Sequence, residues 1–212
     1  MLEEILAYYE VEEIEEKKRK IDEYLSVLRG KREWAGLASK KLSEEPENAV
    51  VDSLGILSVL GSRERRDVVD IGSGAGIVGI VISIVCTDWN VVMAESSARK
   101  ATFLAEVIGS LGLGNARVEN ERAEKLSGRL IFNAAVGRAA GDLGKIVPIA
   151  LGLLMRGGLY VGIKGSVVEA ETRNAKDAIE SSRGELVGIK KPSYPGELGI
   201  PDRVSLVVIR KI

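Results

Sequence analysis

The sequence predicts an α/β fold in which a doubly wound, largely parallel sheet of about seven strands is covered by helices on both faces. Three observations support this prediction. Residues 68–84 have the pattern of a buried strand, a glycine turn and a helix. Strand-like and helix-like segments then alternate along the rest of the chain. The last strand, residues 204–209, is almost continuously apolar, which is typical of a strand buried on both faces.

The glycine turn is a candidate ligand site. Gly72, Gly74 and Gly76 allow backbone angles and close approaches that a Cβ would block, and the following helix presents free N–H groups. The spacing Gly74-x-Gly76-x-x-Gly79 fits a dinucleotide such as NAD. Asp70, at the end of the strand, would repel a pyrophosphate but can accept hydrogen bonds from an ammonium group. The sequence therefore favours S-adenosylmethionine, which carries an ammonium group and no phosphate, and leaves NAD as the alternative.

Two acidic residues after the next strands extend this candidate site. Glu95 ends the predicted strand 91–94, about 20 residues past the glycines, where a carboxylate binds the ribose hydroxyls of an adenosine. The alternative for Glu95 is an ordinary surface glutamate. Glu124 follows the predicted third strand, residues 116–118, and would approach the exocyclic amine of an adenine.

We expect residues 1–62 to form an N-terminal helical extension and residues 63–212 to form the ligand-binding domain. The apolar spacing predicts one long amphipathic helix over residues 2–28 and a second over residues 46–60. Basic residues cluster after the first helix and again before the glycine turn, either as a solvated surface or as contacts to an RNA backbone. These residues are Arg29, Lys31, Arg32, Lys40, Lys41, Arg63, Arg65 and Arg66.

The remaining segments complete the predicted sheet. A pair of glycines, Gly157-Gly158, predicts a turn before the fifth strand. An antiparallel last strand inserted beside the fifth is typical of methyltransferases that use S-adenosylmethionine. The other expected helices begin at Ser97 and span residues 142–155 and 167–182, and the other expected strands span residues 130–136, 159–163 and 185–190.

Composition excludes several kinds of chemistry. The 212 residues include no histidine and one cysteine, Cys86, which excludes an intrachain disulfide, a thiolate zinc cage and any histidine-dependent triad. We expect no metal. No segment has the length and apolarity of a membrane span, and the acidic N-terminus is unlike a signal peptide, so we expect a cytoplasmic protein. The net charge of −1 requires a local basic patch for any polyanionic partner.

Several short motifs occur in a fixed order between Val50 and the C-terminus. They are Val51-Asp52-Ser53-Leu54, Asp70-Ile71-Gly72-Ser73-Gly74-Ala75-Gly76, Arg99-Lys100 with Phe103-Leu104, Arg122-Ala123-Glu124, Arg138-Ala139, Gly162-Ile163-Lys164-Gly165 and Leu206-Val207-Val208-Ile209-Arg210-Lys211. In this order and spacing they resemble the glucose-inhibited division protein B family, which methylates N7 of a guanosine in bacterial small-subunit rRNA. The chain lacks that family's histidines, near Ala49 and at Val204-Ser205.

The resemblance implies a Rossmann-like, seven-stranded methyltransferase fold with an N-terminal helical extension. It also implies S-adenosylmethionine as cofactor and 16S rRNA, or a small-subunit precursor, as partner; we expect a monomer. Arg138 and Lys164 would be the catalytic residues that hold the base or its phosphate, supported by Asp52, although Arg138 could instead form a surface salt bridge. The residues expected to line the cofactor are Asp70, Gly72, Ser73, Gly74, Gly76, Ile77, Glu95, Ser96, Ala123, Glu124 and Arg138.

Guanine N7 has an available lone pair, so its methylation needs positioning more than a strong general base. The absence of histidine is therefore compatible with this reaction. The sequence leaves three alternatives open. They are methyl transfer to another RNA position or a small molecule, a non-catalytic protein that binds S-adenosylmethionine or RNA, and an NAD-dependent oxidoreductase.

Overall fold

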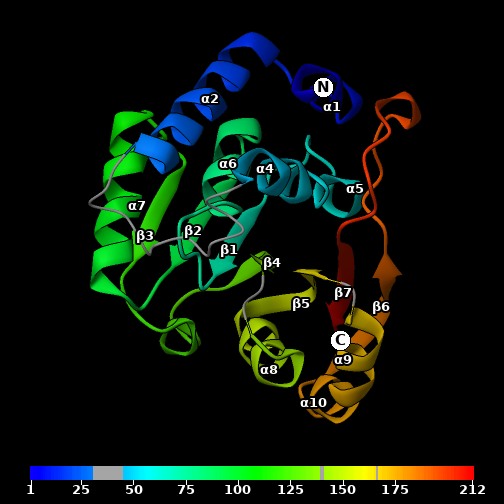
Figure 1. Cartoon of the computed structure of the whole chain (residues 1–212). Coiled ribbons are helices and arrows are strands. Elements are labelled where there is room, and N and C mark those ends of the chain that lie inside the picture. The colour runs from blue at the N-terminus through cyan, green and yellow to red at the C-terminus, as the bar shows by residue number, and fades with distance from the viewer. Residues whose placement is uncertain (31–44, 139–140, 166) are drawn as a thin grey trace.

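The computed structural model describes residues 1–30, 45–138, 141–165 and 167–212, which contain a seven-stranded sheet (Figure 1). The strand order is β3-β2-β1-β4-β5-β7-β6, and β7 runs antiparallel to both β5 and β6. The other neighbouring strands are parallel, so the predicted α/β fold and the antiparallel strand beside the fifth are confirmed. The strands are β1 Asp67–Ile71, β2 Asn90–Ala94, β3 Ala116–Glu119, β4 Phe132–Arg138, β5 Leu154–Lys164, β6 Gly184–Lys190 and β7 Ser205–Lys211.

Helices cover both faces of this sheet (Figure 1). One face carries α1 Leu2–Tyr8, α2 Ile14–Gly30, α4 Pro46–Leu54, α5 Leu57–Leu60, α6 Gly79–Val85 and α7 Ala98–Ser110. The other face carries α8 Leu143–Leu153, α9 Val168–Asn174, α10 Lys176–Ser181 and the short 3-10 helix η2 Ala123–Leu126. A second 3-10 helix, η3 Gly196–Leu198, lies in the loop before β7.

Alternation along the strands divides the apolar residues between two cores. In β1, Val68 packs with the α4 and α6 side, whereas its neighbour Val69 packs with the α8 side. Because parallel strands point the same way, the carboxyl ends of β1, β2, β4 and β5 meet at one edge of the sheet. This carboxyl edge brings the predicted site residues toward one another.

The single helix predicted over residues 2–28 is wrong. The chain turns between α1 and α2, where Glu10 and Glu13 have φ values of 56° and 51°. This turn buries Tyr9 and Val11 against the rest of the protein. The Tyr9 hydroxyl donates a hydrogen bond to the carbonyl oxygen of Ser193, which lies 184 residues later in the sequence. Local periodicity does not reveal a break that depends on so distant a partner.

The helix predicted over residues 46–60 is interrupted between α4 and α5. A Cβ on Gly55, at this break, would lie 2.7 Å from both Cβ of Pro192 and Oη of Tyr194. The Tyr194 hydroxyl also donates to the carbonyl oxygen of Val51 at 2.9 Å. The loop before β7 therefore packs directly on this break, and a glycine is needed for the close approach.

Two further predictions in the C-terminal half are wrong in detail. Gly157 and Gly158 lie inside β5 rather than in a turn before it, and the pairing of β5 with β4 shifts register near Phe132. Gly157 has a φ of 83°, which suits this irregular start of the strand. The helix predicted over residues 167–182 is divided into α9 and α10 at Ala175.

The N-terminal helices share a core with the sheet. Ile5, Ile21 and Leu54 belong to the same buried cluster as Val68 and Ile80. These helices therefore support the strand and the helix that flank the glycine turn. The division into an extension at residues 1–62 and a domain at residues 63–212 stays a prediction.

Candidate active site

The glycine turn between β1 and α6 forms the centre of the candidate site. Gly72, Gly74 and Gly76 have φ values of 67°, 60° and 85°, which strongly favour glycine. A Cβ on Gly76 would lie 2.5 Å from Cδ2 of Leu104, so this residue also allows close packing of α7. A Cβ on Gly72 would meet no described atom within 4 Å, so the space beside that residue is open.

Asp70 lies beneath the glycine turn near the end of β1. Its Oδ2 accepts a hydrogen bond from the backbone N–H of Gly79 at 3.0 Å, and the residue is only 2% exposed. Burial raises the pKa of the Asp70 carboxyl to about 7, against the lowering effect of the Gly79 hydrogen bond. A cationic group placed beside Asp70 would favour its ionised form.

Glu95 connects the end of β2 to the glycine turn. Its Oε2 accepts from the backbone N–H of Gly74 at 2.9 Å, and its Oε1 accepts from that of Ser97 at 2.8 Å. Asn120 donates to the Glu95 carbonyl oxygen at 2.9 Å, which adds a contact from beyond β3. The structure thus brings Glu95 to the glycine turn, as expected for a ligand residue, and its contact with a ribose stays a prediction.

The other predicted cofactor residues surround this turn in different ways. Ser73 is buried and donates through Oγ to the Asp70 carbonyl oxygen at 2.9 Å. Ile77 is also buried. Ala123 is buried in η2, whereas its neighbour Glu124 is exposed, as is Ser96 after β2.

Arg138, at the end of β4, points toward the helix α4. Its Nη2 lies 3.0 Å from Oδ2 of Asp52, and Nη2 of Arg203 lies 3.3 Å from Oδ1 of the same carboxylate. The Asp52 side chain is 5% exposed, so this is a largely buried cluster of two cations and one anion. Burial lowers the pKa of the Arg138 guanidinium, and Asp52 opposes that shift. The structure thus brings Asp52 to Arg138, and the roles assigned to these two residues stay predictions.

Lys164, at the end of β5, points to the other face of the sheet. Its Nζ lies 2.7 Å from Oε1 of Glu171 on α9 and donates to the Gly141 carbonyl oxygen at 2.5 Å. Arg138 and Ile163 are register partners, so Lys164, one residue later, projects away from the Arg138 face. The structure does not bring Arg138 and Lys164 together.

Three contacts at the site depend on residues to which the sequence analysis assigned no role in the site. The buried Tyr24 hydroxyl, on α2, donates to the Ala75 carbonyl oxygen in the glycine turn at 2.7 Å. Arg203 approaches Asp52, and Glu171 approaches Lys164. Tyr24 is part of an apolar helical stripe, so its pattern indicates core packing. Only tertiary structure shows that its hydroxyl reaches the turn.

The residues at the turn fit S-adenosylmethionine. Two buried carboxylates flank an open glycine turn, and this set of acceptors suits an ammonium group and ribose hydroxyls better than a pyrophosphate.

Among the described residues there is no group of three or more potential ligands that could hold a metal ion. None of the described helices is long and apolar enough to span a membrane.

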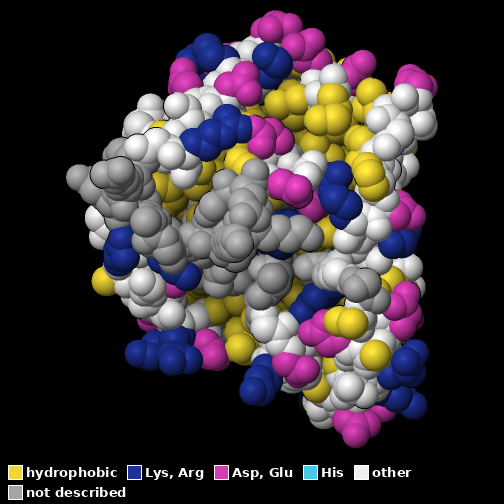
Figure 2. Space-filling model, in the orientation of Figure 1, with side chains coloured by type: hydrophobic (Ala, Val, Ile, Leu, Met, Phe, Trp, Pro, Cys, Tyr) yellow, Lys and Arg dark blue, Asp and Glu magenta, His cyan; other side chains and the backbone are white. Residues whose placement is uncertain are grey.

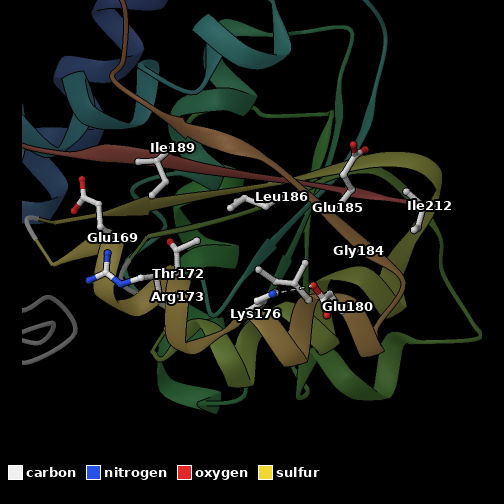
Figure 3. A pocket seen from close by; sticks show the side chains of 11 residues that line it. Glu169, Thr172, Arg173, Lys176, Glu180, Gly184, Glu185, Leu186, Ile189 and Ile212 are labelled. Atoms are coloured by element: carbon white, nitrogen blue, oxygen red, sulfur yellow. Dashed lines mark ion pairs between the residues drawn. The ribbon is translucent and has the colours of Figure 1, made fainter.

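A separate groove of about 840 Å³ lies between α9, α10 and β6 (Figure 3). Apolar side chains of Ile179, Leu186 and Ile189 line it, with charged residues such as Lys176 and Glu180. None of the predicted site residues lines this groove. The groove is therefore distinct from the glycine turn.

The predicted basic residues fall into two groups. Lys31, Arg32, Lys40 and Lys41 lie outside the described residues, and Arg29 forms an ion pair with Glu47. Those at residues 63–66 precede β1 and so lie at the opposite edge of the sheet from Asp70. In Figure 2 the described basic and acidic side chains are interspersed over the visible face. The RNA contacts assigned to these residues stay predictions.

Solved structures of methyltransferases share this fold. Ribosomal protein L11 methylase from Lactobacillus delbrueckii subsp. bulgaricus matches with a TM-score of 0.57 and 16% identity, over 80% of each chain. M. jannaschii TYW2 in complex with AdoMet matches with a TM-score of 0.58 and 16% identity, over 82% of this chain and 78% of that one. The fold is that of the Rossmann-like methyltransferases that use S-adenosylmethionine.

Sequence comparison then identifies the family. A family profile described as GidB, rRNA small subunit methyltransferase G, matches residues 17–195. A relative named ribosomal RNA small subunit methyltransferase G, from Pelotomaculum thermopropionicum, is 34% identical over 93% of this chain and 84% of its own length. Its namesake from Caldicellulosiruptor bescii is 30% identical over 100% of this chain and 91% of its own length. The chain belongs to the GidB family, as its motifs predicted.

Proposed function

We propose that this protein transfers a methyl group from S-adenosylmethionine to N7 of a guanosine in small-subunit (16S) rRNA. One observation carries the proposal: a glycine turn flanked by Asp70 and Glu95 lies at the same sheet edge as Arg138, in a chain of the GidB family. The fold, the acidic flanks of the turn and the names of the relatives all favour a methyltransferase over an NAD-dependent enzyme.

Asp70 and Glu95 have the central roles in the proposed cofactor site. Asp70 would accept hydrogen bonds from the ammonium group, directly or through water, and Glu95 would accept them from the ribose hydroxyls. Bound S-adenosylmethionine supplies an electrophilic methyl group on a sulfonium. The other residues proposed to line it are Gly72, Ser73, Gly74, Gly76, Ile77, Ser96, Ala123, Glu124 and Arg138.

Arg138 is the residue proposed to lie between cofactor and substrate. It follows β4, beside the strand that ends at Asp70, and Asp52 fixes its guanidinium in place. A guanidinium held in this way can orient a base or its phosphate by directed hydrogen bonds. Guanine N7 needs no deprotonation before attack, so orientation is the main contribution required of the protein.

The proposed partner is 16S rRNA or a precursor of the small ribosomal subunit, bound by a monomer. Such a substrate would place the protein in the cytoplasm. Binding of RNA would require local positive charge, because the net charge of the chain is −1.

Transfer of tritium from labelled S-adenosylmethionine tests the proposal. The purified protein is incubated with unmodified small-subunit rRNA, with assembled small subunits, or with a pool of small metabolites. We expect label in the rRNA or the subunit, at N7 of one guanosine. Label only in small molecules, or cofactor binding without transfer to any RNA, would contradict the proposed function.

A further inference from the structure

The side chains of Lys164 and Glu171 bind two backbone groups at Gly141 and Leu143, before and at the start of α8. Nζ of Lys164 donates to the Gly141 carbonyl oxygen at 2.5 Å and lies 2.7 Å from Oε1 of Glu171. The same Oε1 accepts the backbone N–H of Leu143, at the start of α8, at 3.0 Å. One partly buried ion pair therefore binds both a backbone carbonyl and a backbone amide here.

These two backbone groups lie close to Arg138 in the sequence. Gly141 lies three positions after Arg138 in the sequence, and Leu143 lies two positions further. The Arg138 side chain is held by Asp52 of α4, on one face of the sheet. Gly141 and Leu143 are held by Lys164 and by Glu171 of α9, on the other face. Arg138 and the start of α8 are thus held from opposite faces of the sheet.

We propose that Glu171, acting through Lys164 and the Leu143 amide, is a positioning residue that fixes where Arg138 meets the substrate. This inference rests on the proposed function. It also assigns Lys164 to the same positioning role, because its side chain is 7% exposed and its ammonium is paired with a carboxylate on the face opposite Arg138. Direct contact of Lys164 with a substrate phosphate is the competing hypothesis.

The low exposure of the Lys164–Glu171 pair, 7% and 18%, allows its effect on the position of Arg138 to be separated from its effect on stability. Removal of one partner leaves an uncompensated charge, which destabilises the fold, whereas replacement of both partners by apolar residues is often neutral. A double substitution, Lys164→Met with Glu171→Leu, therefore avoids the unpaired charge. It still removes the groups that bind the Gly141 carbonyl and the Leu143 amide.

The experiment compares both single variants, the double variant and Lys164→Arg. The matched control replaces the exposed ion pair of α10 by Lys176→Met and Glu180→Leu. Nζ of Lys176 lies 3.9 Å from Oε1 of Glu180 (Figure 3). Measurements are the melting temperature, S-adenosylmethionine affinity, kcat and KM on small-subunit rRNA, and amide hydrogen exchange of Leu143.

We expect the single variants to lose roughly 10 °C in melting temperature, and the double variant to recover most of that loss. The double variant should still lose about 10- to 100-fold in kcat and show faster exchange of the Leu143 amide, with cofactor affinity unchanged. Lys164→Arg keeps a cation for Glu171 and should recover part of kcat. The control variant, with Lys176 and Glu180 replaced, should have the same kcat and Leu143 exchange as the unmodified protein.

Two results would overturn the inference. If the double variant has the same kcat and the same Leu143 exchange rate as the unmodified protein, the pair only stabilises the fold. If the Lys164→Met variant has a raised KM for RNA and the Glu171→Leu variant has a lowered one, Lys164 contacts RNA. Failure of the proposed function gives a different result: the unmodified protein would then transfer no methyl group to rRNA, while hydrogen exchange would still test the anchoring.

Discussion

At the scale of single residues, Asp70 is a carboxylate whose ionisation the fold changes strongly. It is buried beneath the glycine turn, where its side chain accepts a hydrogen bond from the Gly79 amide. Burial raises the pKa of this carboxyl to about 7, so near neutral pH it is only partly ionised without a ligand. A ligand that carries an ammonium group would stabilise the ionised form and release a proton on binding.

The affinity for S-adenosylmethionine should therefore rise as the pH rises from 5.5 to 7. This range lies below the ordinary pKa of an α-amino group, about 7.7–8.0, so the ligand itself stays protonated. The same raised pKa of Asp70 should make the ligand-free protein less stable as the pH rises from 3.8 to about 7, because the folded state retains the proton longer.

Calorimetry in a pH series and in buffers of different ionisation enthalpy measures the affinity and the proton release. Asp70→Asn should bind at least about 10-fold more weakly at pH 7 and lose most of the pH dependence, since the ionised carboxylate is gone. An affinity that falls with rising pH in the unmodified protein would contradict the assignment of Asp70.

Arg138 gives a second prediction at this scale. Arg138→Ala removes a cation from the Asp52 cluster and the proposed contact to the base, so kcat/KM for rRNA should fall by about 100-fold. Arg117→Ala, which removes a half-exposed arginine paired with Glu119 on β3, is the control and should leave activity unchanged. If Arg138→Ala leaves both cofactor affinity and methyl transfer unchanged, the role of Arg138 is refuted.

At the scale of elements, α6 is held close to β1 and β2 because Gly79 begins it. A Cβ on Gly79 would lie 2.6 Å from Cγ of Met93 in β2 and 2.9 Å from Oδ2 of Asp70. At this position of the dinucleotide-like spacing, a glycine is therefore explained by close packing. The missing side chain allows the first amide of α6 to reach the Asp70 carboxylate.

Gly79→Ala should lower both stability and cofactor affinity. Overpacking at a buried contact costs about 1–3 kcal/mol, and Asp70 must move to relieve it. Gly109→Ala is the matched control, because Gly109 lies in α7 and an added Cβ meets no described atom within 4 Å. That control should be neutral or slightly stabilising. Thermal melts and calorimetry check both variants, and equal behaviour of the two would contradict the packing argument.

Elements were predicted best where local pattern and tertiary structure agree. The strand, glycine turn and helix at residues 68–84 combine β-branched residues, glycines and helical spacing, and the structure matches them. The break between α1 and α2 depends on Tyr9 and its distant partner Ser193, so no local pattern indicates it. The same holds at Gly55, where the reason for the break lies in Pro192 and Tyr194.

At the scale of the whole molecule, the order of strands determined which predicted site residues could meet. Asp70, Glu95 and Arg138 follow strands whose carboxyl ends share one edge, so position along the sequence was sufficient to group them. Lys164 shares the edge but not the face, because alternation along β5 directs it toward α9. The ion pair between Lys164 and Glu171 could be identified only from the full structure.

Mass spectrometry of small-subunit rRNA from cells with and without this gene tests the central claim most directly. Our account predicts that one 7-methylguanosine is present in rRNA from cells with the gene and absent without it. It also predicts that the unmodified gene restores this methylation, whereas one encoding Arg138→Ala does not. An identical set of methylated nucleosides in both strains would contradict the claim that this protein methylates N7 of a guanosine in small-subunit rRNA.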